Sequence, residues 1–133
     1  MNILIVGSGA REHAIARALQ KSPKQKTLYC LATNTNPGLQ ELCSDLQIID
    51  LNDNATISQF AREKEVSLAI IGPENPLANG LTDILMGSNF KVVGPTKEHS
   101  KIESSKSFAR NLLVEYKIPA CPKYKIFNSM KGV

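Results

Sequence analysis

The first residues of the chain that could do chemistry form a glycine turn followed by three ionisable side chains. Gly7 and Gly9 follow a short apolar run, and Arg11, Glu12 and His13 come directly after them. A glycine turn before a helix lets the backbone approach a phosphate, whose charge is stabilised by amide hydrogens and by the helix dipole. At a helix start an arginine can bind a phosphate and a glutamate can cap free amides. The segment therefore predicts an anion site, with helix capping as the alternative for Glu12 and local packing for His13.

A second candidate group stands in the middle of the chain. Glu74 lies between Pro73 and Pro76, after an apolar run that ends at Gly72. A carboxylate held in a rigid loop at a strand end could accept two hydrogen bonds from vicinal hydroxyls of a ribose. The alternative is an ordinary solvated loop acid.

Apolar patterns predict the elements that position these residues. Five β-rich runs, at residues 2–6, 27–31, 46–51, 67–71 and 90–93, alternate with helical spacing at 11–21, 54–65 and 77–85. A polar loop with Asn34, Asn36, Pro37 and Gly38 separates the second and third runs, and residues 105–117 form a last helical stripe. Parallel strands need crossovers that cover the sheet, so the alternation predicts an α/β fold, a five-stranded parallel sheet with helices on both faces.

Three of the strand ends run into glycine-containing loops. These loops are residues 7–13, 72–76 and 94–96. Ligands of open parallel sheets bind beyond the carboxyl ends of the strands. We therefore expect the three loops to line one crevice.

Two common nucleotide sites fit the chain poorly. A dinucleotide site needs a third glycine where Glu12 stands, and an acidic residue near the end of the second strand, where the chain reads Leu31-Ala32-Thr33. No GxxxxGK[ST] loop is present, which disfavours a P-loop site.

Composition excludes further classes. Hydrophobic residues make up 42% of the 133 residues and charged residues 21%, as in ordinary globular domains. No apolar run is long enough to cross a bilayer, so no membrane role is expected. The net charge of +4 comes with scattered lysines and only 5% aromatic residues, which argues against nucleic-acid binding. Three cysteines without CxxC spacing favour free thiols in the cytoplasm and give no metal site.

Six segments together resemble the phosphoribosylamine-glycine ligase family, whose members belong to the ATP-grasp superfamily. Residues 6–13 are similar to its GxGxREH motif, Asn36-Pro37-Gly38 to the loop after its second strand, and residues 72–77 to its GPExPL segment. Residues 94–96 resemble its GPT turn, residues 103–108 its EGSKxF motif and residues 117–119 its KIP. The chain departs from the family at Ser104, where glycine is usual, and at residues 33–35.

The resemblance implies a function, a fold and a set of site residues. The family joins 5-phosphoribosylamine to glycine with ATP and Mg²⁺ or Mn²⁺, through an acyl phosphate, giving glycinamide ribonucleotide. It implies a Rossmann-like pre-ATP-grasp domain over residues 1–104, and a linking helix with the start of an ATP-grasp domain over 105–133. This stretch would then bind the sugar phosphate, hold no cofactor tightly and not perform the ligation alone. The implied substrate-binding residues are Gly7, Ser8, Gly9, Arg11, Glu12, His13, Asn36, Pro37, Gly38, Gly72, Pro73 and Glu74, with Lys106 for ATP.

Three other interpretations stay open on the sequence alone. The chain could be the first domain of another ATP-grasp ligase, a nucleotide-binding Rossmann module without catalysis, or a structural interaction domain. Binding of ribose 5-phosphate, of NAD or ATP, or of none of them distinguishes these classes.

Overall fold

The computed structural model describes residues 1–119, 121–127 and 129. Its centre is a sheet of five parallel strands in the order β3-β2-β1-β4-β5. The strands are β1 (Asn2–Val6), β2 (Thr27–Ala32), β3 (Asp45–Ile48), β4 (Leu68–Ile71) and β5 (Lys91–Val93). The helices are α1 (Ala10–Gln20), α2 (Pro37–Leu42), α3 (Asn54–Glu63), α4 (Glu74–Ala78), α5 (Leu81–Gly87), α6 (Lys97–Ser104) and α7 (Lys106–Glu115). The predicted α/β fold with a five-stranded parallel sheet is confirmed.

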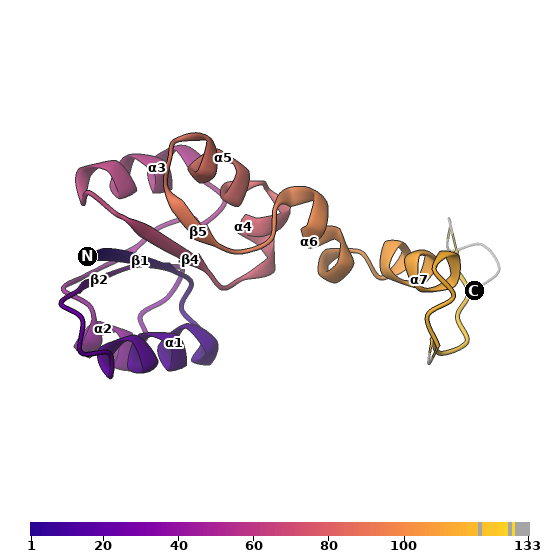
Figure 1. The fold of residues 1–133 in the computed structure, drawn as a ribbon, viewed down its shortest axis with the longest axis horizontal. Helices are drawn as coiled ribbons and strands as arrows, with labels where there is room; N and C mark the ends of the chain where they lie inside the picture. The colour runs from indigo at the N-terminus through magenta and orange to yellow at the C-terminus, as the bar shows by residue number, and fades with distance from the viewer. Residues whose placement is uncertain (120, 128, 130–133) are drawn as a thin grey trace.

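Helices cover both faces of the sheet (Figure 1). Successive side chains of a strand point to opposite faces, so β1 supplies two cores. Ile3 and Ile5 pack into the core beneath α1 and α2, whereas Leu4 and Val6 pack into the core beneath α3, α4 and α5. All four side chains are fully buried. The central strand is therefore apolar on both sides, as the uninterrupted run of residues 3–6 predicts.

Three expected elements differ in the structure. The polar loop around Asn36 contains a helix, α2, because the Asn36 side chain caps it and Pro37 occupies its first turn. The helical stripe at residues 77–85 is divided into α4 and α5 at Gly80, whose φ of +83° is left-handed. The third strand ends at Ile48 rather than at residue 51, and Leu51 lies in the loop that follows.

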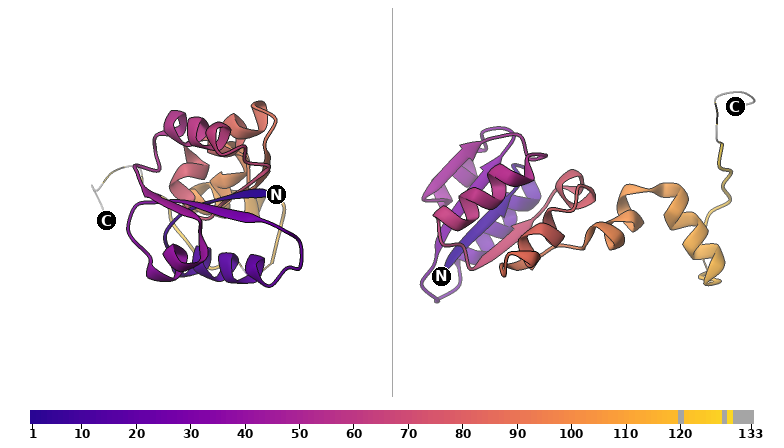
Figure 2. Two further views of the ribbon diagram at one scale, coloured as in Figure 1. Left: turned by 90° about the vertical axis from the view of Figure 1, so that its left-hand side faces the viewer. Right: turned by 90° about the horizontal axis from the view of Figure 1, so that it is seen from above.

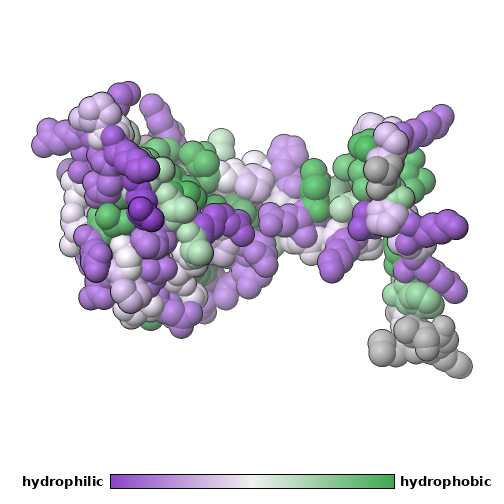
Figure 3. Space-filling model, turned by 90° about the horizontal axis from the view of Figure 1, so that it is seen from below, coloured by the Kyte–Doolittle hydropathy of each residue, from purple (hydrophilic) through white to green (hydrophobic). Residues whose placement is uncertain are grey.

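The last two helices extend away from the sheet. Figure 2 shows α6 and α7 leading out from the body. α6 begins at its N-cap Thr96 and was not expected from the sequence, while α7 corresponds to the predicted stripe at 105–117. Hydrophobic side chains are exposed along this extension, and on the face in Figure 3 green hydrophobic atoms lie there between purple hydrophilic ones. Among them are Ile102, Val114, Tyr116 and Ile118. Among the described residues, no helix has the length and apolar character needed to cross a membrane.

Candidate functional site

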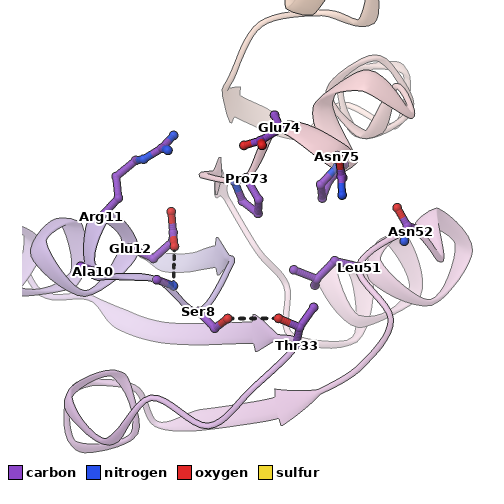
Figure 4. Close-up of a pocket in the computed structure, with 12 residues that line it drawn as sticks. Ser8, Ala10, Arg11, Glu12, Thr33, Leu51, Asn52, Pro73, Glu74 and Asn75 are labelled. Atoms are coloured by element: carbon purple, nitrogen blue, oxygen red, sulfur yellow. Dashed lines mark hydrogen bonds between the residues drawn. The ribbon is translucent and has the colours of Figure 1, made fainter. Parts of the chain in front are cut away.

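A pocket opens at the carboxyl ends of the strands, where the chain order of the sheet reverses between β1 and β4. Strands β1, β2 and β3 follow one another outward to one side, and the crossover through α3 returns the chain to the other side of β1. Such a switch point leaves a crevice, because the loops after the two central strands turn to opposite faces. The pocket here has a volume of about 440 Å³ (Figure 4). Its lining consists of Ser8, Gly9, Ala10, Arg11, Glu12, Thr33, Leu51, Asn52, Pro73, Glu74, Asn75 and Pro76.

The wall of the pocket after β1 is the glycine turn and the first turn of α1. Glu12, the third residue of that helix, turns back so that Oε2 accepts the Gly9 N–H at 2.6 Å. Only 5% of Glu12 is exposed. The N–H of Gly7 donates to the carbonyl of Leu31 at 2.8 Å. The amides of both glycines are thus engaged within the chain, which was not expected from the anion-site pattern.

Two side chains hold the glycine turn against neighbouring strand ends. Arg11 donates from Nη1 to the carbonyl of Gly72 at 2.8 Å, which links the loops after β1 and β4. Asn36 donates from Nδ2 to the carbonyl of Ser8 at 2.9 Å, while its Oδ1 accepts the N–H groups of Gly38 and Leu39. Each bond replaces water on a backbone carbonyl, so both loops are held in one arrangement before a ligand arrives.

Glu74 forms the opposite wall. It is the first residue of α4, after Pro73 as N-cap, and its side chain is exposed. Figure 4 shows it across the opening from Arg11, with Ser8 and Thr33 hydrogen-bonded between their hydroxyls at 3.2 Å on the β2 side. A carboxylate, a guanidinium and two hydroxyls therefore face one cavity. This set suits a small polar ligand that carries both hydroxyl groups and negative charge.

The chain is similar to known proteins over nearly its full length. A family model described as "Phosphoribosylglycinamide synthetase, N domain" matches residues 1–103. The chain belongs to this family. It is 39% identical over 131 residues to a phosphoribosylamine-glycine ligase of Methanosarcina barkeri, and that match covers 98% of the chain and 30% of the relative. The chain thus spans about 30% of the length of the relative it matches.

Solved structures of the same fold include two synthetases. A phosphoribosylglycinamide synthetase from Anaerococcus prevotii superposes with a TM-score of 0.65 at 15% identity, over 87% of this chain and 29% of that one. An N5-carboxyaminoimidazole ribonucleotide synthetase from Thermotoga maritima gives 0.72 at 17% identity, over 96% of this chain and 34% of that one. At these identities the two structures support the fold alone.

The structure brings together half of the substrate residues expected from the family motifs. Six of the twelve line the pocket: Ser8, Gly9, Arg11, Glu12, Pro73 and Glu74. Gly7 and Gly72 lie directly behind them against Glu12, and the segment 36–38 supports the turn from outside. Lys106 lies on α7 beside a different cavity. The loop at 94–96 does not line the pocket, contrary to the expectation of one crevice from three loops, because Gly94 packs against Leu77 and Thr82.

His13 lies outside the pocket, between α1 and α2. Its imidazole ring occupies the space that a Cβ on Gly38 would need. This agrees with the packing interpretation of His13 and explains why the Asn36-Pro37-Gly38 segment ends in glycine. The segment and His13 therefore belong to one structural unit.

Ala10, Asn75 and Pro76 belong to the loops that were expected at the pocket, and the lining residues that the sequence did not indicate are Thr33, Leu51 and Asn52. Leu51 and Asn52 were hidden by the expected length of the third strand, which placed Leu51 inside the sheet. Thr33 was noted only for the acid missing at the end of β2. Strand ends in a parallel sheet share one edge, and this rule could have assigned all three.

No metal centre accompanies the site in the described part of the chain. Among residues 1–119, 121–127 and 129, no group of three or more histidine, cysteine or acidic side chains could hold a metal ion. The donor set that Mg²⁺ prefers is several oxygen ligands, and these residues do not supply it. No step of the chemistry is therefore assigned to a metal here.

Two thiols lie beneath the glycine turn. Cys30, on β2, is fully buried and donates from Sγ to the carbonyl of Gly7 at 3.4 Å. Hydrogen bonding with Cys43 and burial raise the pKa of the Cys30 thiol far above its usual value. The same hydrogen bond lowers the pKa of Cys43, which is half-buried at the end of α2.

Alkylation should separate these thiols, because the thiolate is the reactive form. In the native chain we expect iodoacetamide to modify Cys43 well before Cys30, because the raised pKa keeps Cys30 a thiol while the lowered pKa leaves more of Cys43 as thiolate. As the pH is lowered, the rate at Cys43 should fall less steeply than the rate at Cys30. Peptide mass spectrometry measures both rates. Urea-unfolded chain is the control, in which the two rates should converge. Equal native rates would show that Cys30 is neither protected nor shifted.

Proposed function

We propose that this chain is the amino-terminal substrate domain of an ATP-dependent ligase that joins 5-phosphoribosylamine to glycine and gives glycinamide ribonucleotide in purine biosynthesis. The observation that carries the proposal is the pocket at the switch point, where the Glu74 carboxylate faces Arg11 across a cavity. Membership of the family and the names of its relatives support it. We place the activity in the cytoplasm, as the free cysteines of the sequence suggested.

In this proposal the sugar phosphate binds with its ribose hydroxyls at Glu74 and its phosphate at Arg11. Glu74 accepts hydrogen bonds from the ribose hydroxyls, because an exposed carboxylate is a strong acceptor with no donor of its own. The phosphate lies toward Arg11 and the outer edge of the turn at Ser8, since the Gly9 amide already donates to Glu12. Gly7, Gly72, His13 and residues 36–38 then act by shaping the turn rather than by touching the ligand.

ATP and its metal belong to the longer protein in this proposal. Lys106, Ser107, Arg110, Tyr124, Lys125 and Ile126 line a separate cavity of about 300 Å³. Three cationic side chains there suit a phosphate chain, so we assign Lys106 to ATP. Residues 1–104 would form the substrate domain, and residues 105–133 the linking helix and first part of an ATP-grasp domain that supplies the ligands for Mg²⁺ or Mn²⁺. The ligation itself requires glycine and that further domain.

Glu74→Ala tests the assignment of the pocket. Loss of one charged hydrogen-bonding group costs about 1.5–3 kcal/mol, so ribose 5-phosphate should bind roughly 10- to 150-fold more weakly. Affinity for inorganic phosphate should stay nearly unchanged, because Glu74 is assigned to the hydroxyls. Isothermal titration calorimetry on the 133-residue chain measures both, with circular dichroism to confirm the fold.

The matched control is Glu41→Ala, which removes an exposed carboxylate from α2, outside the pocket. It should leave both affinities as in the parent. Unchanged ribose 5-phosphate binding in Glu74→Ala would reject the hydroxyl assignment. If the parent binds NAD instead of the sugar phosphate, the chain is a nucleotide module, and if it binds neither, an interaction domain.

A further inference from the structure

Glu12 is surrounded by backbone from two strand ends. A Cβ on Gly7 would lie 2.8 Å from its Cδ, a Cβ on Gly9 would lie 2.9 Å from its Oε2, and a Cβ on Gly72 would overlap its Oε1. These three glycines therefore form a cradle with no side chains of its own. The Glu12 carboxylate fills the cradle, and only 5% of this residue is exposed to solvent.

The cradle has the chemistry of an anion site. It contains a glycine turn at the start of an eleven-residue helix, where the helix dipole favours negative charge. An anion is in fact bound there, because Glu12 Oε2 accepts the Gly9 N–H at 2.6 Å. Arg11 donates from Nη1 to the Gly72 carbonyl, which places its positive charge at the edge of the cradle. The chain thus supplies its own anion to the place where a nucleotide fold holds a diphosphate.

We propose that Glu12 determines specificity by closing the glycine turn to diphosphates. A diphosphate entering the turn would meet the negatively charged Glu12 carboxylate at the Gly9 amide that it needs. A monophosphorylated sugar avoids this conflict, because its single phosphate can lie at the outer rim beside Arg11. The binding of a monophosphorylated sugar rests on the proposed function. The exclusion of diphosphates rests only on the contacts of Glu12.

A test of this role must distinguish the negative charge of Glu12 from the volume of its side chain. Glutamate at the third helical position is also an ordinary cap, and a purely structural Glu12 would need only an acceptor for the Gly9 N–H. Glu12→Gln keeps an acceptor oxygen and nearly the same volume but removes the negative charge. A structural role predicts no change in anion binding for this variant, and an excluding charge predicts a gain.

The experiment is a calorimetric titration of the 133-residue chain with inorganic pyrophosphate and, separately, with ribose 5-phosphate. Glu12→Gln should bind pyrophosphate about 10-fold more tightly than the parent, or better, since repulsion is replaced by a neutral neighbour. Glu41→Gln is the matched control: it makes the same change in net charge on the exposed side of α2 and should leave pyrophosphate affinity within about 2-fold of the parent.

The outcomes remain informative if a variant is unstable. Glu12→Gly, which restores the third glycine of the dinucleotide pattern, should show the same gain, read as a rise in melting temperature with pyrophosphate. The parent needs no substitution and should bind ribose 5-phosphate in preference to pyrophosphate. Pyrophosphate binding to the parent as tight as to folded Glu12→Gln overturns the inference. If the parent does not bind ribose 5-phosphate but Glu12→Gln still binds pyrophosphate more tightly than the parent, only the proposed function is rejected.

Discussion

Gly72→Ala should lower the free energy of unfolding by about 3 kcal/mol, because the added methyl group enters a filled space. Its carbon would lie 2.6 Å from Cδ of Glu12 and overlap Oε1. A flexible glutamate on the surface would swing aside at little cost. Glu12 is instead buried, and moving it breaks the bond to the Gly9 N–H in addition to the packing. Urea denaturation followed by circular dichroism measures the change.

Two further variants test whether the stability lost in Gly72→Ala is caused by its contact with Glu12. Gly87→Ala adds the same methyl group at the end of α5, where nothing lies within 4 Å, and should stabilise the chain by about 0.5 kcal/mol through the unfolded state. In a Glu12→Ala background the cost of Gly72→Ala should fall below about 1 kcal/mol, since contacting residues are not additive. If the full cost persists without the Glu12 side chain, the strain lies in the backbone of Gly72 and not in this contact.

The sheet could be predicted because its signal is local and repeated. The buried parallel strands are short apolar runs, such as residues 2–6 and 68–71, and the crossover helices α1 and α3 carry apolar residues at helical spacing. The short crossover helix α2 lacks that spacing and was expected to be a loop. The apolar runs do not show at which residue a strand ends. Ile49 and Leu51 continue the apolar alternation of the run 46–51 beyond the end of β3 at Ile48, so the sequence placed Leu51 in the strand rather than in the pocket.

The site was predicted in its residue types but not in its contacts. The pattern around Gly7 and Gly9 indicated an anion at the turn, and an anion is there, but it is the side chain of Glu12. A sequence shows that glutamate replaces a third glycine; it does not show that the side chain reaches Gly72, sixty positions later. That contact depends on β1 and β4 being neighbours, which is a property of the sheet order. Long-range packing therefore decided the role that local pattern left open.

Leu85→Ala should destabilise the chain by about 3 kcal/mol, while Ile84→Ala on the same helix should cost about 1 kcal/mol or less. Periodicity placed both side chains on one inward stripe of a helix running from residue 77. Gly80 separates α4 from α5, so the buried face of α5 does not continue the stripe of α4. Leu81 and Leu85 are fully buried, whereas 43% of Ile84 is exposed. Deleting Leu85 leaves a cavity beside the sheet, and deleting Ile84 removes mainly solvated surface. Urea denaturation of both variants measures the difference, and equal costs would mean that α4 and α5 form one continuous helix in solution.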